Sequence, residues 1–256
     1  MNLDKIVKMN NPQLSIVIAT YNSFQTIARA LDSVRYQSFQ DWECIVVDGA
    51  STDDTIKIVA EYAQEDSRFR YVSEKDNGIY DAFNKGWKMA KGEWIHYLGS
   101  DDWVTENGFH EIMCENYENI GVITGDVWYV KPNGQKQIVK SMGWLGSHQG
   151  KLVRRFLLHD MDGFNENYRI KADWDLLLRM QKKNITIKNI PVVIAYFSGE
   201  GISQSSIWQS SKETYYILRS NGASVFYSTY KFLYDLTYKT TRFLYHKILL
   251  CFEKCK

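Results

Sequence analysis

The sequence predicts an α/β protein with a mostly parallel sheet. Short apolar runs rich in β-branched residues recur in the first half, as expected for strands that are buried on both faces. Segments with apolar residues at helical spacing separate these runs. Strand and helix alternate four times, which is typical of βαβ units on a parallel sheet.

The predicted strands place polar residues at one edge of this sheet. The four strands lie in Leu14–Tyr21, Trp42–Gly49, Phe69–Glu74 and Glu93–Asp102. Their ends read ATYN, VDGAS, SEKDNG and GSDD, and three of these four carry an aspartate. Because ligands of such sheets bind at the carboxyl ends of the strands, we expect a polar site there.

Three helices are predicted between these strands, over residues 23–38, 51–64 and 78–92. Ser51 and Asp54 give the second helix a start that resembles a capping box. Gly92 is the expected C-cap of the third helix.

The second half has a different pattern. Residues 121–140 predict a hairpin with its turn at Pro132–Gly134, and residues 185–198 hold one or two strands. Ile170–Asn184 reads as a helix that buries Leu176, Leu177 and Met180. We expect residues 1–222 to form one domain with two halves, which cover about 12–105 and about 106–222.

The last 34 residues, 223–256, predict a basic aromatic helical tail. This segment contains six Lys or Arg and only two acidic residues, and Phe, Tyr and Leu recur in it every three or four residues. Such a helix suits an anionic membrane surface. The alternative is a helical hairpin that packs on the domain.

Composition narrows the class of protein. The chain has 256 residues and a formal net charge of +1, which argues against nucleic acid as a partner. Its four cysteines form no C-x-x-C, so a reduced, cytoplasmic chain is expected. Cys251 and Cys255 fit one helix face, either as inert residues or as a site of lipid attachment or redox pairing. No signal peptide and no transmembrane run are visible.

Asp101 and Asp102 end the fourth strand as adjacent like charges, which cannot both lie unpaired in a dry core. A divalent cation bound to a diphosphate takes one or two carboxylates together with phosphate oxygens and water. The alternative is that Ser100 or Asp101 caps a following helix.

Four motifs in order resemble family 2 glycosyltransferases, which have the GT-A fold. They are SIVIATYN, ECIVVDGASTDDT, NGIYDAFNKGWKMAKGEWIHYLGSDD and ADWDLLLR, and the resemblance runs from about Leu14 to Ser203. The combination of SEKDNGIYDAFNKG with HQG is similar to bacterial enzymes that build O-antigen, capsule and exopolysaccharide. The resemblance implies an inverting sugar transfer from a nucleotide donor, with UDP-hexoses favoured. It also makes about 12–105 the donor-binding half and about 106–222 the acceptor-side half.

The resemblance also implies roles for single residues. The predicted nucleotide-sugar contacts are Thr20, Tyr21, Asp48, Asp76, Asn84, Lys85 and Asp101. Asp102 is the expected ligand of Mn²⁺ or Mg²⁺. Core packing is the alternative for Tyr21, and a turn is the alternative for Asp48.

Inversion needs one base, which the family carries in a Glu-Asp dipeptide. The matching text is KADWD, so Asp173 is the expected base, Ala172 replaces the glutamate and Asp175 is the fallback. Helix capping is the alternative for Asp173. His148 and Trp144 are candidates for binding the acceptor or a diphosphate, and each has a structural role as its alternative.

These expectations describe a cytoplasmic enzyme, peripheral at the inner face of the cell membrane, that uses a lipid-diphosphate-linked saccharide as acceptor. The alternative is a catalytically inactive sugar-nucleotide or glycan-binding module. A Rossmann dehydrogenase is excluded because no G-x-G-x-x-G follows the first strand.

Overall fold

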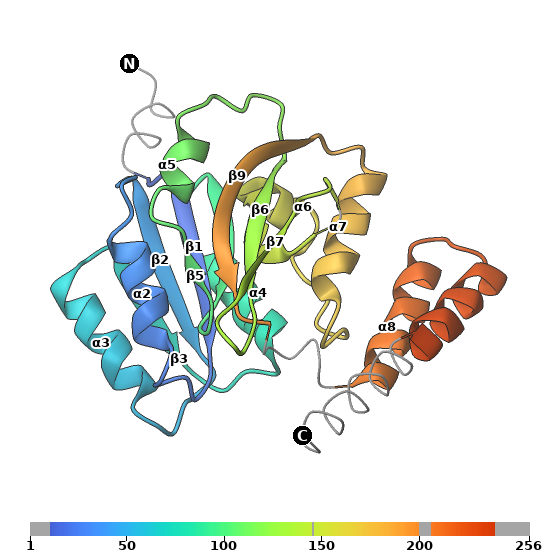
Figure 1. The fold of residues 1–256 in the computed structure, drawn as a ribbon, viewed down its shortest axis with the longest axis horizontal. Coiled ribbons are helices and arrows are strands. Elements are labelled where there is room, and N and C mark those ends of the chain that lie inside the picture. Colours follow the sequence, from blue (N-terminus) through green and yellow to red (C-terminus); the bar gives the residue numbers. More distant parts are fainter. Residues whose placement is uncertain (1–10, 145, 200–205, 239–256) are drawn as a thin grey trace.

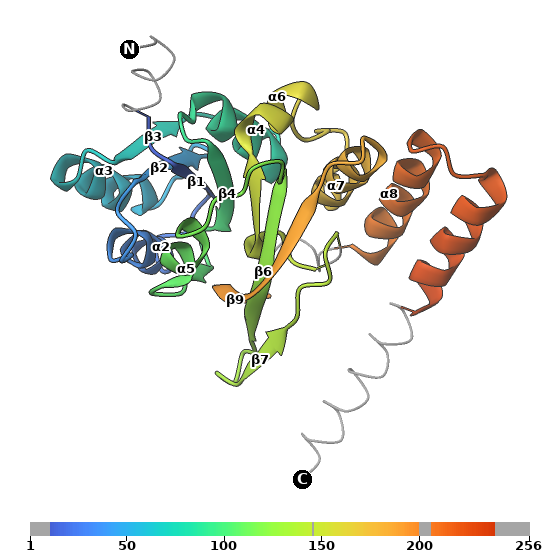
Figure 2. The same cartoon turned by 90° about the horizontal axis from the view of Figure 1, so that it is seen from above.

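A computed structural model describes residues 11–144, 146–199 and 206–238. One curled sheet of nine strands runs through the molecule in the order β3-β2-β1-β4-β8-β6-β9-β5, and β7 pairs with β6 (Figures 1 and 2). The strands are β1 Leu14–Thr20, β2 Trp42–Asp48, β3 Phe69–Ser73, β4 Trp94–Gly99, β5 Trp103–Val104, β6 Val122–Val130, β7 Lys136–Val139, β8 Lys151–Arg154 and β9 Ile187–Phe197.

The first four strands are parallel neighbours, as the alternating pattern predicts. β1 pairs with β2 on one side and β4 on the other, and β2 pairs with β3. Every residue of β1 and β2 is buried, because helices cover both faces of the sheet. The carboxyl ends of these strands, at Thr20, Asp48 and Gly99, therefore meet at one edge.

Two layers of helices enclose two apolar cores. The helices are α2 Ile27–Arg35, α3 Thr55–Glu65, α4 Ile79–Met89, α5 Gly108–Met113, α6 Arg155–Asp160, α7 Ala172–Lys182 and α8 Ile207–Ser220, together with a 3₁₀ turn η1 at His148–Gly150. One core lies between the sheet and α2, α3 and α5. The other lies between the sheet and α4, α6 and α7 (Figure 2).

The second half adds antiparallel pairing to this sheet. β8 is antiparallel to both β4 and β6 and thereby joins the two halves. The predicted hairpin is confirmed as β6 and β7, and the predicted helix with buried Leu176, Leu177 and Met180 is confirmed as α7. Residues 187–197 form one strand rather than two.

Two predicted helix ends are wrong. No capping box joins Ser51 and Asp54: α3 begins at Thr55, and Asp53 accepts hydrogen bonds from the Thr55 backbone N–H and hydroxyl. The C-cap of α4 is Ala90, not Gly92. A Cβ at Gly92 would instead lie 2.6 Å from the backbone nitrogen of Ser15. The close approach of these two backbone segments therefore explains this glycine.

The described part of the predicted tail is helical over residues 225–238 and lies beside α8 (Figure 1). The Trp208 and Phe232 rings meet edge to face with centroids 5.4 Å apart. Lys171 Nζ lies 3.1 Å from Asp235 Oδ2, which joins this helix to the start of α7. Cys251 and Cys255 lie outside the described residues.

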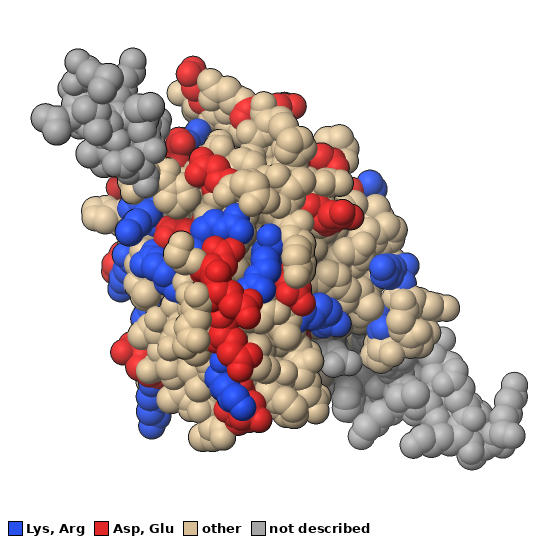
Figure 3. Space-filling model, turned by 90° about the vertical axis from the view of Figure 1, so that its left-hand side faces the viewer, with Lys and Arg blue, Asp and Glu red and all other residues tan. Residues whose placement is uncertain are grey.

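The surface carries both signs of charge. Figure 3 shows basic and acidic side chains interspersed over one face, and neither sign covers that face. Among the described helices, none combines the length and the apolar character that crossing a bilayer requires. Cys44 is buried and Cys114 is exposed, and both are free thiols.

Replacing Gly86 by alanine tests the packing of α4 on β1. The new Cβ would lie 2.2 Å from Val17 Cγ1, which is a deep overlap. Helix propensity favours alanine by about 1 kcal/mol, whereas overpacking a core costs about 1–3 kcal/mol or more. We expect the urea-unfolding free energy of Gly86→Ala to fall by about 1–2 kcal/mol, since the overlap outweighs propensity.

Lys88→Ala, on the exposed side of the same helix, is the control and should change that free energy by less than about 0.5 kcal/mol. Unaltered stability of Gly86→Ala would contradict the close packing.

Candidate active site

The loops that follow β1 and β2 are fastened to each other. Asn22 receives a hydrogen bond from the Thr52 backbone N–H at 2.8 Å, and its own N–H donates to Ser51 Oγ at 2.8 Å. Asn22 and Ala50 both adopt positive φ, 48° and 61°, which side chains rarely do. The two strand ends are therefore held in a specific, strained arrangement of the kind found at functional sites.

Asp48 and Thr20 lie at the base of this arrangement. Asp48 is fully buried, and its carboxylate accepts hydrogen bonds from Ser51 N–H at 3.0 Å, from the Ser51 hydroxyl and from Ser73 Oγ at 2.6 Å. The Thr20 hydroxyl is buried and has no hydrogen-bond partner among the described residues. Tyr21, by contrast, is 61% exposed, so it is no core residue.

Asp76, in the loop after β3, and Lys85, on α4, border the same strand ends. Asp76 Oδ2 lies 2.7 Å from the place of a Cβ on Gly49, so this glycine allows the carboxylate to approach. Burial raises the pKa of Asp76 above its usual value, although the Gly78 N–H and Lys85 oppose that shift. Lys85 Nζ pairs with Glu74 at 3.0 Å and bonds the Lys75 carbonyl at 3.1 Å.

Asp101 and Asp102 converge above Gly99. Asp101 Oδ1 and Asp102 Oδ2 lie 2.8 and 2.9 Å from the place of a Cβ on that glycine. Asp102 accepts from Gln149 Nε2 at 2.8 Å and from Ser198 N–H at 2.9 Å. Burial, and then the charge of Asp101, raises the pKa of Asp102 to about 6.

This pair is suited to a divalent cation. No cluster of three or more His, Cys, Asp or Glu side chains that could enclose a metal occurs in the ranges that the structure describes. Two converging carboxylates over a glycine fit a cation that takes its remaining oxygens from phosphate and water. The pair caps no helix, since α5 begins only at Gly108.

The segment between β7 and β8 contacts both this pair and Asp173. Gln149 bonds Asp102, and the neighbouring His148 places Nδ1 3.6 Å from Asp173 Oδ2. Lys151 is buried, and its ammonium group donates to the carbonyl oxygens of Gly146 and Ser147 at 3.0 and 3.1 Å. Burial lowers the pKa of Lys151 to about 8, although the charge of Asp173 opposes that shift.

Asp173 lies in the first turn of α7, whose N-cap residue is Lys171. The Tyr80 hydroxyl lies 3.0 Å from Asp173 Oδ1 and 2.9 Å from the Ile170 carbonyl oxygen. Burial raises the pKa of Asp173, but His148, the Trp174 N–H and Tyr80 outweigh it, so the pKa is lowered overall. Asp173 is therefore ionised at neutral pH and able to accept a proton.

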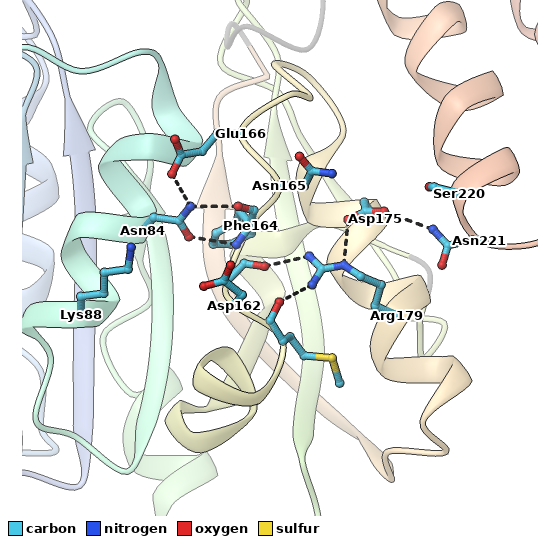
Figure 4. A pocket seen from close by; sticks show the side chains of 12 residues that line it. Asn84, Lys88, Asp162, Phe164, Asn165, Glu166, Asp175, Arg179, Ser220 and Asn221 are labelled. Atoms are coloured by element: carbon cyan, nitrogen blue, oxygen red, sulfur yellow. Dashed lines mark hydrogen bonds and ion pairs between the residues drawn. The ribbon is translucent and has the colours of Figure 1, made fainter.

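Asn84 and Asp175 lie elsewhere, around a cavity of about 450 Å³ (Figure 4). Both donors and both acceptor positions of the Asn84 amide are used, by Phe164 N–H and carbonyl oxygen, Glu166 and Trp87. Asp175 pairs with Arg179 at 2.8 Å and accepts from Asn221 Nδ2 at 3.1 Å. Their geometry favours structural roles over the predicted roles of donor contact and fallback base.

A second cavity, of about 540 Å³, opens beside Asp173. Its lining comes from α7, α8 and the 225–238 helix: Ile170, Lys171, Asp173, Trp174, Ser210, Thr214, Leu218, Tyr227, Lys231 and Asp235. Trp144 lies apart from this lining and packs against the core under α4 and α7.

Sequence reasoning missed the groups that hold the carboxylates. Tyr80, Gln149 and Ser198 each bond one of the candidate aspartates. Tyr80 and Gln149 stand in quoted motifs, NGIYDAFNKG and HQG, which assigned them no role, and Ser198 stands in none. The adjacency of Gln149 to His148 was the signal available. Nothing in the sequence near Ser198 indicates that its N–H meets Asp102, 96 residues earlier.

An α/β sheet with carboxylates at its strand ends and one further carboxylate at the start of α7 is an arrangement that sugar transfer can use. The model of glycosyl transferase family 2 matches residues 15–177, so the chain belongs to this family and is a glycosyltransferase.

Relatives and solved structures agree with this assignment. The PGL/p-HBAD biosynthesis glycosyltransferase of Mycobacterium tuberculosis is 29% identical over 211 residues, which cover 75% of this chain and 79% of that protein. S. aureus TarS 1-349 in complex with UDP-GlcNAc aligns with a TM-score of 0.67 at 22% identity, covering 88% and 71%. Mannosyltransferase PcManGT from Pyrobaculum calidifontis, in complex with GDP-Man and Mn²⁺, gives 0.65 at 16%, covering 82% and 64%. The predicted GT-A fold is confirmed.

Asp48→Asn should loosen the strand-end loops. An amide cannot accept all three hydrogen bonds that the buried carboxylate receives, and an unmet buried donor costs about 1–3 kcal/mol. We expect the unfolding free energy to fall by about that amount and UDP affinity, measured by calorimetry, to fall with it.

Ser73→Ala, which removes one of the three bonds, is the matched control and should cost about 0.5–1.5 kcal/mol. An Asp48→Asn protein with unaltered stability would show that the three hydrogen bonds to Asp48 do not stabilise the strand-end loops.

Proposed function

We propose that the enzyme moves a hexose or N-acetylhexosamine from a UDP-sugar to a hydroxyl of a lipid-diphosphate-linked saccharide, with inversion, in the assembly of bacterial surface polysaccharide. The observation that carries this proposal is Asp173. It is a single ionised carboxylate, oriented by Tyr80 and His148, and one short segment connects it to Asp102. The UDP-GlcNAc complex of TarS supports the choice of nucleotide.

The reaction is a single displacement. The acceptor hydroxyl oxygen attacks the anomeric carbon while the bond from that carbon to the diphosphate oxygen breaks, and Asp173 takes the hydroxyl proton. Tyr80 and His148 hold the carboxylate in place. Asp102, with Asp101 beside it, would hold Mn²⁺ or Mg²⁺, which supplies positive charge for the departing diphosphate.

Donor contacts are proposed at the strand ends. The exposed ring of Tyr21 is free to stack on a base, and the Thr20 hydroxyl offers a polar contact that the described residues leave unused. Asp48 keeps one lone-pair position beyond its three bonds, but it is fully buried, so a uracil N–H would reach it only after the loop that carries Ser51 shifts. Asp76 and Lys85 flank the same edge.

The acceptor is proposed to enter the 540 Å³ cavity. Asp173 lies in its wall, and Trp174 and Tyr227 supply aromatic faces of the kind that pack on sugar rings. The division of the chain at residue 222 stays a prediction. Residues 225–238, which lie beyond that division, supply Tyr227, Lys231 and Asp235 to the cavity wall.

Screening nucleotide sugars for UDP release tests the proposal. Turnover should require Mn²⁺ or Mg²⁺ and stop after metal is stripped with EDTA, and Asp102→Ala should remove it. Full turnover by the stripped enzyme would exclude the metal, and turnover with GDP-sugars alone would exclude UDP.

Asp173→Asn should fold, bind UDP and lose transfer by a factor of about 10² to 10⁴, the usual contribution of a positioned base. Asp175→Asn should instead lose stability, by about 1–3 kcal/mol, because it removes the carboxylate charge from Arg179, which keeps its bonds to the carbonyl oxygens of Met161 and Gly163. Kinetics and urea unfolding of both variants distinguish Asp173 from Asp175 as the base. Near-normal turnover of Asp173→Asn with an inactive but folded Asp175→Asn would move the base to Asp175.

Membrane contact is proposed for the outer face of the 225–238 helix. Phe226, Tyr230, Leu233 and Tyr234 recur at helical spacing and are 87, 55, 52 and 48% exposed. This face lies next to the stripe of Tyr227, Lys231 and Asp235 that lines the cavity, turned from it by about 100° around the helix. An anionic leaflet would cover the aromatics while the cavity receives the saccharide.

Replacing Phe226 and Tyr230 together by serine should weaken co-sedimentation with vesicles containing phosphatidylglycerol by tenfold or more, since each buried aromatic contributes roughly 1.5–3 kcal/mol. Tyr216→Ser, at an exposed position of α8, is the control. Equal vesicle binding by the double variant, or no binding by the intact chain, would contradict membrane contact here.

A further inference from the structure

Glu213 is a buried carboxylate that no part of the proposed reaction uses. It lies on α8 and is 2% exposed. Its oxygens accept from the backbone N–H groups of Arg169, Ile170 and Lys171 at 2.9, 3.0 and 2.9 Å. Gln209 Nε2, one turn earlier on α8, adds a fourth hydrogen bond at 2.9 Å.

The three N–H groups belong to the segment that leads directly into α7. A helix start leaves backbone N–H groups without partners in the helix, and a nearby side chain usually accepts from them. The described part of α7 has no side-chain cap of its own at Lys171. Glu213, 42 to 44 residues further along the chain, accepts from the N-cap residue and the two residues before it, so it fixes the segment that leads into α7.

The position of this segment determines where Asp173 lies. The Tyr80 hydroxyl meets both the Ile170 carbonyl oxygen, inside the segment, and Asp173 Oδ1, just beyond it. A shift of residues 169–171 would therefore separate Asp173 from Tyr80 and His148. A misplacement of about 1 Å at a reacting group costs up to about 10²-fold in rate.

We propose that Glu213 is a positioning residue for the sugar transfer: it fixes residues 169–171 and thereby holds Asp173 against Tyr80 and His148. The inference rests on the proposed role of Asp173 as base. It gives α8 a part in catalysis, through a residue that touches neither the donor nor the acceptor.

A positioning role has a consequence that simple stabilisation lacks. The groups that face Asp173 are Tyr80 from α4, His148 from η1 and Lys151 from β8, with the Trp174 N–H on its own helix. These hydrogen bonds and the His148 charge lower the pKa of Asp173 against burial. If Glu213 is lost, they weaken, the pKa rises, and the acid limb of the rate profile moves to higher pH.

The test compares Glu213→Gln with Glu43→Gln. A glutamine at 213 cannot accept from all four donors. Its kcat for UDP release should fall by about tenfold or more with the KM for the donor nearly unchanged, and its acid limb should move to higher pH. Carboxyl ¹³C titration of labelled aspartates, with Asp173 assigned through Asp173→Asn, should show the same rise without any substrate.

Glu43 is the matched control, because it is also buried and holds the Lys91 N–H at 2.6 Å, but at the opposite end of β2. Glu43→Gln should lose stability and keep both kcat and the acid limb. If Glu213→Gln does not fold, Gln209→Ala, which frees one side of the carboxylate, should move the limb in the same direction by less.

A folded Glu213→Gln, or in its place Gln209→Ala, with normal kcat and an unmoved Asp173 titration would overturn the inference. So would a shift of equal size in Glu43→Gln. Failure of the underlying function looks different: Asp173→Asn would then keep near-normal turnover, whatever happens at Glu213.

Discussion

The accumulation of negative charge at one edge of the sheet is the constraint on which the rest of this structure depends. Asp48, Asp76, Asp101, Asp102 and Asp173 gather around the carboxyl ends of the strands. Like charges that are partly removed from water oppose one another, and burial raises the pKa of both Asp76 and Asp102. A bound cation, and a nucleotide that hydrogen-bonds the remaining polar groups, would reduce this repulsion. Without them the gathered carboxylates lower the stability of the fold, which is a common cost of a binding site.

Each carboxylate is held by donors from a different part of the chain. Asp48 accepts from its own loop. Asp102 accepts from the residue after β9 and from η1. Asp173 contacts α4 and η1. The second half of the molecule therefore supports the strand-end carboxylates as well as Asp173. Its segment 146–151 contacts both Asp102 and Asp173, so the two carboxylates share one support.

Much of the fold could be predicted from the sequence, because the signals for it are local. Continuous apolar runs such as Leu14–Tyr21 indicate a strand buried on both faces, and the structure confirms β1 there. Helix ends were less predictable: Gly92 looks like a C-cap, but close approach to Ser15 is what requires it. The carboxylates themselves could be found by motif. Their supports could not, since contacts such as Ser198 to Asp102 depend on the folded sheet and leave no periodic pattern.

Residues 172–175 show how two nearby carboxylates acquire separate tasks. Two positions on a helix are roughly 200° apart, so Asp173 and Asp175 point to different sides of α7. One side meets Tyr80 and His148, and the other meets Arg179 and Asn221. Ala172, where the family motif has glutamate, is fully buried in the core under α4 and α7. A charge at that position would lie in an apolar surrounding. The carboxylate that holds the residues just before α7 comes instead from α8, as Glu213.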